Sequence, residues 1–327
     1  MLGAGSWGTT FAKVLADSGQ DVMVWGRRQD VALDINKNHA NTAYLPDIAL
    51  PEAMQATTDV AEALRGTELV VLAVPSQTMR ENVTQWAHLI PERAVVLSLA
   101  KGIELGTGLR MSEVITEVGD IPADRVAVLS GPNLAREIAE EKPAATVIAC
   151  QNADRARWLQ EHTATSYLRP YSNMDVIGCE LAGAMKNVIA LACGMADGLN
   201  LGDNSKASLM TRGLAEMTRL GLALGAQAQT FSGLAGMGDL IATCASGLSR
   251  NHRFGEFLAR GHSLESARLA TGQTAEGVVS CVAIAELAGK VAVELPITQE
   301  VMRVCHEGRA PQAALAAFMA RDTRAED

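Results

Sequence analysis

The first half of the chain alternates short apolar, β-branched runs with stretches that carry apolar residues at helical spacing. The runs cover residues 21–25, 68–74, 94–99, 126–129 and 145–149, and a further extended segment covers residues 166–171. Their apolar character is continuous rather than alternating, which is typical of strands that are buried on both faces of a sheet. The pattern therefore predicts a largely parallel sheet with helices on either side, over residues 1–172.

The pattern changes after residue 173, where β-branched runs become rare. Segments rich in Ala, Leu, Met and Gly follow at residues 176–195, 206–224, 273–288 and 298–307. This composition favours helices, so we expect a mostly helical, all-α second domain over residues 173–327, with a frayed polar tail at residues 321–327. The expected fold class is an α/β N-terminal domain followed by an all-α C-terminal domain.

Length, composition and net charge narrow the possible functions. The 327 residues allow two domains, and a chain with 48% apolar and 20% charged residues is folded rather than disordered. Twenty-eight Lys and Arg residues against thirty-seven Asp and Glu residues give a net charge of −9, so we expect no nucleic-acid partner. Any anionic ligand then requires a local cluster of cations.

The cysteines and the first apolar stretch bear on the cellular compartment. The six cysteines show no CxxC and no Cys/His pair at metal-ligand spacing, which argues against a disulfide framework and a structural zinc ion and favours reduced, cytoplasmic thiols. Lys13 and Asp17 interrupt the first apolar stretch, and no later window holds eighteen uncharged apolar residues. We therefore expect a cytoplasmic protein without a signal peptide and without membrane insertion.

The chain opens on a glycine-rich loop, Met1-Leu-Gly3-Ala-Gly5-Ser-Trp-Gly8, followed by a helical pattern and then a strand. In this GxGxxG pattern, Gly3 permits a tight turn, Gly5 lets backbone N–H groups approach a pyrophosphate, and Gly8 lets helix and strand pack closely. The positive end of the helix dipole then faces the phosphates. Alone the motif also fits an ordinary turn, but in this context it predicts a Rossmann-type dinucleotide-binding domain.

The strand before this loop is short. Only Met1 and Leu2 precede Gly3, whereas the first strand of such a domain needs about five or six residues. Either the chain is clipped, or its assigned start lies inside that strand. The sequence leaves both alternatives open.

The end of the next strand bears on the choice of cofactor. An NAD site usually places an acid there, on the ribose 2′-hydroxyl, whereas an NADP site offers Arg to the 2′-phosphate. This chain has Trp25-Gly26-Arg27-Arg28, with no acid before Asp30. We predict that NADP(H) is accepted and preferred, with Arg27 and Arg28 near the 2′-phosphate; the alternative is a solvated basic loop.

A lysine interrupts the most apolar helical segment, at residues 176–193. Lys186 breaks the pattern of a helix that is apolar nearly all the way round, and a buried lysine is costly unless it is paired or used. Desolvation also brings the pKa of a buried lysine toward neutrality, which makes Lys186 a candidate general acid/base. Gly183 and Asn187 share its helix face. The alternative is a lysine that reaches solvent from a helix end.

Polar groups follow two of the expected strands. Lys101 follows the strand at residues 94–99, and Ser130-Gly131-Pro132-Asn133 follows the strand at residues 126–129. Both therefore lie at the carboxyl edge of the sheet, where open α/β sheets bind ligands. Each also fits an ordinary loop.

Two further segments lie in the helical domain. Three glycines within residues 233–238 precede Asp239, and Ser249-Arg250-Asn251 offers a hydroxyl, a guanidinium and an amide in succession. Such groups suit a phosphate, which Arg binds through two parallel hydrogen bonds. The alternative for residues 249–251 is a capped helix start with Arg250 on the surface.

Taken together, these motifs resemble the bacterial-type NAD(P)-dependent sn-glycerol-3-phosphate dehydrogenases. The matching segments are GAGSWGT at 3–9, AVPSQ at 73–77, AKGIE at 100–104, SGPNLAREI at 130–138, ELAGAMKNVIAL at 180–191, GLNLGDNSKA at 198–207, GLAGMGDL at 233–240, SRN at 249–251 and AEGV at 275–278. The resemblance covers nearly the whole chain. It implies that hydride transfer at C2 interconverts dihydroxyacetone phosphate and sn-glycerol 3-phosphate for phospholipid synthesis, with NADP(H) or NAD(H), without a metal ion, in a homodimer.

The resemblance also implies roles for individual residues. Lys186 is the catalytic proton acceptor for the C2 hydroxyl, and Thr243 adjoins the site. The substrate is lined by Lys101, Gly131, Asn133, Lys186, Asp239, Ser249, Arg250 and Asn251. The cofactor contacts Gly3, Gly5, Ser6, Trp7, Gly8, Arg27, Arg28, Lys101, Ala135, Arg250 and Glu276. The chain departs from the family pattern at Asn133, where Ser or Thr is more frequent, and in its short first strand, which is expected to weaken the sheet and cofactor affinity.

Two other functions remain open at this point. The first is another NADP-dependent reductase with the same two-domain plan, which acts on a keto acid such as ketopantoate. Such an enzyme needs cations for a carboxylate, whereas GLAGMGDL followed by SRN favours a phosphate. A catalytically silent NADP-binding sensor has no use for a lysine in a buried helix, so Lys186 together with Asp239 argues against it.

Overall fold

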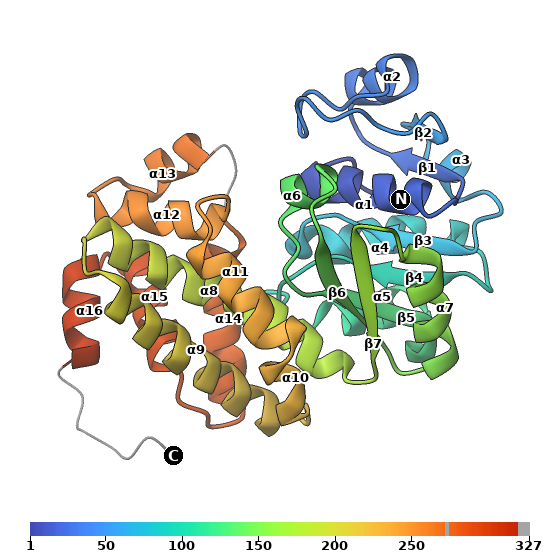
Figure 1. Ribbon diagram of the computed structural model, residues 1–327. Helices are drawn as coiled ribbons and strands as arrows, with labels where there is room; N and C mark the ends of the chain where they lie inside the picture. Colours follow the sequence, from blue (N-terminus) through green and yellow to red (C-terminus); the bar gives the residue numbers. More distant parts are fainter. Residues whose placement is uncertain (272–274, 320–327) are drawn as a thin grey trace. The chain divides into compact units, whose positions relative to one another are not determined.

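The computed structural model describes residues 1–271 and 275–319 of the chain (Figure 1). Unit 1 comprises Met1–Glu104 and Leu109–Glu180, and unit 2 comprises Leu105–Gly108 and the residues from Leu181 onward. The boundary at Glu180 falls inside one continuous helix, α8 (Val176–Gly198). The frayed tail expected at residues 321–327, and the start of the helical segment expected at residue 273, lie outside the described residues.

Strands and helices alternate along unit 1, as the hydrophobic pattern predicts. The strands are β1 (Val22–Trp25), β2 (Met54–Thr57), β3 (Leu69–Leu72), β4 (Val95–Ser98), β5 (Val126–Ser130), β6 (Ala144–Cys150) and β7 (Leu168–Asn173). The helices are α1 (Ser6–Asp17), α2 (Gln29–Asn38), α3 (Val60–Leu64), α4 (Met79–Trp86), α5 (Met111–Gly119), α6 (Ala135–Ala139) and α7 (Ala153–Thr163). Strand β2 was not predicted, because Gln55 is polar and only four residues form the strand.

The sheet of unit 1 is largely parallel, which confirms the prediction. β1 pairs in parallel with β2, and β3, β4 and β5 pair in parallel in that order. β6 is antiparallel to β5 and parallel to β7. Leu2 joins the two groups of strands, since it bridges in parallel both to Trp25 in β1 and to Leu72 in β3. The short segment before the glycine loop therefore lies in the sheet, between β1 and β3.

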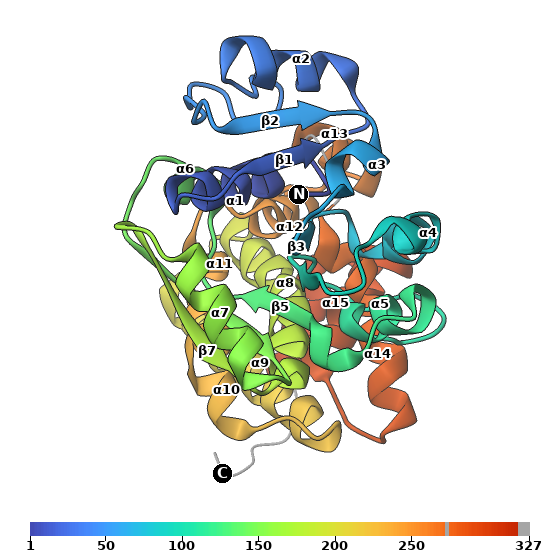
Figure 2. The same cartoon turned by 90° about the vertical axis from the view of Figure 1, so that its right-hand side faces the viewer.

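Apolar layers cover both faces of this sheet. One cluster contains Phe11 of α1 and Leu159 of α7, and the other contains Val83 of α4. Figure 2 shows α7 on one side of β5 and α4 and α5 on the other. Neighbouring strand residues alternate between the clusters, with Val71 in the first and Val70 in the second. The strand runs are continuously apolar because both faces of the sheet are buried.

The regular structure in the described part of unit 2 is helical, as expected. Besides most of α8, the helices are α9 (Asp203–Ala223), α10 (Ala228–Ser232), α11 (Asp239–Ala245), α12 (Arg250–Ala259), α13 (Leu264–Thr271), α14 (Glu276–Lys290), α15 (Pro296–His306) and α16 (Pro311–Met319). A π-helical turn at Leu234–Gly238 leads directly into α11.

Helix α8 forms the core of unit 2. Every residue from 181 to 196 is buried, as expected of a helix that is apolar nearly all the way round. Length and composition alone would let α8 cross a membrane, yet 94% of its most apolar eighteen-residue window is buried within the protein, as in a core helix. Helix α12 packs against its backbone, since a Cβ on Gly255 would lie only 2.2 Å from the carbonyl oxygen of Leu191.

Candidate active site

The glycine loop at the start of unit 1 has the geometry that its motif requires. Gly3 adopts a φ of +124°, and a Cβ there would lie 2.4 Å from the carbonyl oxygen of Ala73. A Cβ on Gly8 would lie 2.1 Å from the carbonyl oxygen of Gly3, whereas one on Gly5 would meet no described atom within 4 Å. The first and third glycines thus close the turn, and the second leaves space for a ligand to approach the backbone.

The N-terminus of α1 offers hydrogen-bond donors at this loop. Helix α1 begins at Ser6, and Gly5 has no side chain that could cap the N–H groups of the first turn. The indole Nε1 of Trp7 is buried and has no partner among the described residues. Thr10 donates a hydrogen bond of 3.2 Å to the carbonyl oxygen of Ala135, which brings α6 against α1. The uncapped N–H groups of this first turn fit the pyrophosphate of a dinucleotide.

The predicted 2′-phosphate residues Arg27 and Arg28 are both exposed, just after β1. Arg28 binds Asp30 with both ends of its guanidinium, and the Nε to Oδ1 distance is 3.0 Å. The hydrogen bond from Arg28 lowers the pKa of the Asp30 carboxyl below its usual value. The guanidinium also lies 5.8 Å from the centre of the Tyr44 ring. The pairing of Arg28 with Asp30 was not predicted, since the sequence has no acid between Trp25 and Asp30.

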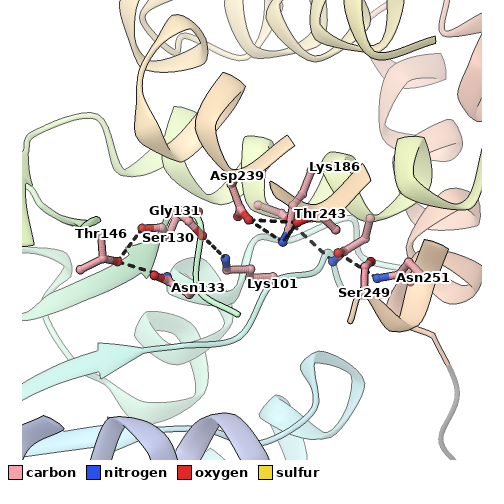
Figure 3. Close-up of polar contacts among 12 residues, drawn as sticks. Lys101, Ser130, Gly131, Asn133, Thr146, Lys186, Asp239, Thr243, Ser249 and Asn251 are labelled. Carbon is pink, nitrogen blue, oxygen red and sulfur yellow. Dashed lines mark hydrogen bonds and ion pairs between the residues drawn. The ribbon is translucent and has the colours of Figure 1, made fainter. Parts of the chain in front are cut away.

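The predicted ligand residues of unit 1 come together at the carboxyl ends of β4 and β5 (Figure 3). Lys101 donates a hydrogen bond of 3.0 Å from Nζ to the carbonyl oxygen of Gly131. Asn133 donates a 3.1 Å bond to Thr146, whose hydroxyl in turn donates to the carbonyl oxygen of Ser130. The amide oxygen of Asn133 is buried and has no partner among the described residues. The edge of the sheet thus carries a cation beside an ordered loop.

Lys186 lies at the centre of a buried polar group in unit 2 (Figure 3). Its Nζ donates to Oδ1 of Asp239 and to Oγ1 of Thr243, each at 2.7 Å. The Thr243 hydroxyl also donates to Asp239, at 3.1 Å. The Lys186 side chain is 10% exposed and that of Asp239 is 1% exposed. The lysine is therefore paired, and it does not reach solvent from a helix end.

The local fold of unit 2 places Asp239 and Thr243 opposite Lys186. These two residues are four apart on α11, so they share one face of the helix. The glycines before Asp239 form the π-helical turn, and a Cβ on Gly236 would lie 2.1 Å from the carbonyl oxygen of Phe231. Such π-helical turns frequently occur at functional sites. The glycine-rich segment therefore sets where α11 begins.

The three residues of the Ser-Arg-Asn segment, at 249–251, differ in burial and in hydrogen-bond partners. Ser249 caps α12 by accepting a hydrogen bond from the N–H of His252, and Arg250 is exposed, as the capped-helix alternative predicts. Asn251 is buried and donates a 2.9 Å bond to the amide oxygen of Asn187. Its own amide oxygen accepts from the N–H of Gly277, next to Glu276 at the start of α14.

Thr243 and Asn187 were predicted to lie near the site, but their partners were not predicted. The spacing of Asp239 and Thr243 by four residues was an available signal for a shared face. The pairing of Asn187 with Asn251 and of Asn251 with Gly277 had no signal, since these residues are far apart along the chain.

Comparison with known proteins identifies the family. The family models for the N-terminus and the C-terminus of NAD-dependent glycerol-3-phosphate dehydrogenase match residues 1–156 and 175–316. The glycerol-3-phosphate dehydrogenase (NAD(P)+) of Corynebacterium jeikeium is 59% identical over 327 residues, which is 100% of this chain and 98% of that relative. The enzyme of the same name from Streptomyces griseus is 58% identical, over 100% of this chain and 97% of that relative.

Comparison with solved structures supports the same family. Glycerol-3-phosphate dehydrogenase from Coxiella burnetii has a TM-score of 0.93 at 40% identity and covers 98% of both chains. A ketopantoate reductase from Ralstonia eutropha, at a TM-score of 0.56 and 16% identity over 98% of this chain and 100% of its own, shares the fold alone. The chain therefore belongs to the family of NAD-dependent glycerol-3-phosphate dehydrogenases, oxidoreductases that act on a CH–OH group with NAD(P).

Proposed function

We propose that this protein interconverts dihydroxyacetone phosphate and sn-glycerol 3-phosphate with NADP(H) or NAD(H), and so supplies glycerol 3-phosphate for phospholipid synthesis. The observation that carries the proposal is the buried group formed by Lys186, Asp239 and Thr243. Hydride transfer at an alcohol carbon requires a group that exchanges the hydroxyl proton, and a lysine held in a buried site supplies it.

Lys186 is the proposed acid and base at the C2 oxygen. When bound, the nicotinamide accepts or donates the hydride at C2 of the substrate. In the oxidative direction Nζ of Lys186 takes the proton of the C2 hydroxyl, and in the reductive direction Nζ returns it to the carbonyl oxygen. Asp239 and Thr243 engage two of the three positions on Nζ, so the third is directed at the substrate oxygen.

Cations, amides and a hydroxyl form the proposed set of substrate-binding residues. Lys101 and Arg250 supply positive charge, which an acidic protein must provide locally. Asn133, Ser249 and Asn251 supply hydrogen-bond donors, and Gly131 allows close backbone approach. Asp239 lines the substrate as the partner of Lys186. Ser249 already caps α12 through Oγ, which leaves its hydroxyl hydrogen for an anion.

The proposed cofactor site uses the glycine loop and the donors around it. Gly3, Gly5 and Gly8 shape the loop, and Ser6 and Trp7 begin α1 beside it. The remaining proposed contacts are Arg27, Arg28, Lys101, Ala135, Arg250 and Glu276. Preference for NADP(H) is part of the proposal, and it rests on the two exposed arginines after β1.

The roles of the two domains, the cellular location and the oligomeric state are also proposals. We assign dinucleotide binding to residues 1–172 and substrate binding with catalysis to residues 173–327. A cytoplasmic location is supported by the six cysteines, all of which are buried free thiols. The homodimer rests on family resemblance, and the net charge of −9 argues against nucleic acid.

A spectrophotometric assay of NADPH oxidation tests the function. Dihydroxyacetone phosphate should drive oxidation of NADPH by the purified protein, and ketopantoate should not. Turnover of ketopantoate in place of dihydroxyacetone phosphate would identify the keto-acid reductase instead. No oxidation with either substrate, combined with tight NADPH binding, would favour the sensor.

A further inference from the structure

The amide of Asn251 is fixed in one orientation by two buried contacts. Its oxygen accepts a hydrogen bond of 2.9 Å from the N–H of Gly277. Its nitrogen donates a bond of the same length to the amide oxygen of Asn187. Asn251 and Asn187 are only 8% and 6% exposed. Because a backbone N–H can only donate, the oxygen of Asn251 must face Gly277, and the orientation of the amide is determined.

Gly277 can make this contact because it has no side chain. As the second residue of α14, it has an N–H without a partner inside the helix. A Cβ at this position would lie 2.5 Å from the backbone oxygen of Asn187 and 2.8 Å from Cδ1 of Leu191. Any larger residue would therefore push the start of α14 away from α8 and lengthen the bond to Asn251.

The fixed orientation determines which ligand Asn251 suits. An amide nitrogen carries two N–H donors, and Asn187 takes one of them. The second N–H is the donor that the side chain of Asn251 can still offer to a ligand. A phosphate dianion accepts hydrogen bonds and does not donate them. An amide turned the other way would direct its oxygen at the phosphate and repel it.

We propose that Gly277 is a positioning residue for the substrate phosphate, acting through the amide of Asn251. The proposal rests on the proposed function and deepens it. Gly277 touches neither the reacting atoms nor the phosphate in this account. It ensures that Asn251 presents only an N–H to the phosphate.

Steady-state kinetics of a Gly277→Ala variant tests this, with Gly289→Ala as the matched control. Gly289 lies in the same helix, and a Cβ there would meet no described atom within 4 Å. Loss of a hydrogen bond to a charged group predicts that Gly277→Ala raises the KM for dihydroxyacetone phosphate about tenfold or more. The kcat and the KM for NADPH should stay within about twofold of the parent, as should all constants of Gly289→Ala. An unchanged KM for dihydroxyacetone phosphate overturns the proposal.

A double-mutant cycle separates positioning from general destabilisation. If Gly277 acts through Asn251, then Gly277→Ala should raise the KM little further in an Asn251→Ala background. The same fold-increase in both backgrounds would contradict the positioning role, because it would show an effect independent of Asn251.

A third variant keeps the proposal testable if Gly277→Ala does not fold. Asn251→Asp retains an oxygen that accepts from Gly277 and loses both N–H donors. It should fold, and its KM for dihydroxyacetone phosphate should be raised at least as much as in Asn251→Ala. A KM equal to that of the parent overturns the proposal. A parent protein that fails to oxidise NADPH with dihydroxyacetone phosphate contradicts the proposed function instead, so the two failures are distinguishable.

Discussion

Lys186 and Asp239 form a buried ion pair, with 2.7 Å between Nζ and Oδ1. Thr243 completes the group, since its hydroxyl bonds to both partners. Taking two charges out of water is so unfavourable that apolar residues of similar size often stabilise a core equally well. The proposed role of Lys186 in proton exchange gives a reason for this costly pair, which joins α8 to α11.

Thr243→Val should lower kcat. Valine matches threonine in shape and removes the hydroxyl that holds Nζ of Lys186. We expect kcat to fall about tenfold, because one hydrogen bond to a charged group is lost while the ion pair remains. Thr243→Ser keeps the hydroxyl and is the control. A kcat for Thr243→Val within about twofold of that for Thr243→Ser would show that Thr243 does not orient Lys186.

Asp30→Asn should shift cofactor preference toward NADP(H). Asp30 occupies the guanidinium of Arg28, so its neutralisation frees this cation for the 2′-phosphate. The ratio of kcat/KM for NADPH over NADH is expected to rise about two- to fivefold, since exposed ion pairs are weak. Asp21→Asn makes the same charge change at the other end of β1. An equal rise in both variants would trace the effect to net charge and not to Arg28.

Arg250→Ala should raise the KM for dihydroxyacetone phosphate strongly. Arg250 is exposed at the start of α12, so its removal leaves the fold intact while it takes away a cation from the proposed phosphate site. We expect an increase of about tenfold or more, with a smaller change in kcat. Arg260→Ala, at the other end of the same helix, is the control. A KM unchanged by Arg250→Ala would place the phosphate elsewhere.

Glu216→Gln should flatten the dependence of stability on pH. Glu216 accepts backbone hydrogen bonds from Ile297 and Thr298 at the start of α15, and burial raises its pKa from 4.5 to about 7. The folded state therefore binds the proton more tightly, and the stabilisation present below pH 4.5 is lost as pH rises through 7.

Denaturant unfolding of the parent and of Glu216→Gln checks this. The parent should lose on the order of 3 kcal/mol relative to the variant as pH rises across this window. Parallel curves for the two proteins would mean that Glu216 titrates normally.

The sequence predicts the fold more completely than it predicts the contacts within the site. Continuous apolar runs predict the strands of unit 1 well, because burial on both faces leaves a direct compositional signal. The strand with Gln55 lacks that signal, since its side chains alternate between buried and exposed. Residues 249–251 show a further limit, because only packing reveals that Asn251 contacts Asn187.

Lys186 was recognisable because a charge in an apolar helix conflicts with its surroundings. The partners of Lys186 were harder to recognise, because Asp239 follows it by fifty-three positions in the sequence. Gly277 is the extreme case. Its contribution is a backbone N–H and the absence of a Cβ, and neither leaves a mark in a single sequence.

The central claim is that Lys186 exchanges the proton of the C2 oxygen, and single-turnover and steady-state kinetics of Lys186→Ala test it most directly. NADPH affinity, measured by fluorescence titration, should be nearly that of the parent. Lys186→Arg is the companion variant, since it keeps the positive charge beside Asp239 but cannot release a proton in a protein. Both variants should bind NADPH and lose turnover. Retention of about a tenth or more of kcat in either variant would contradict it.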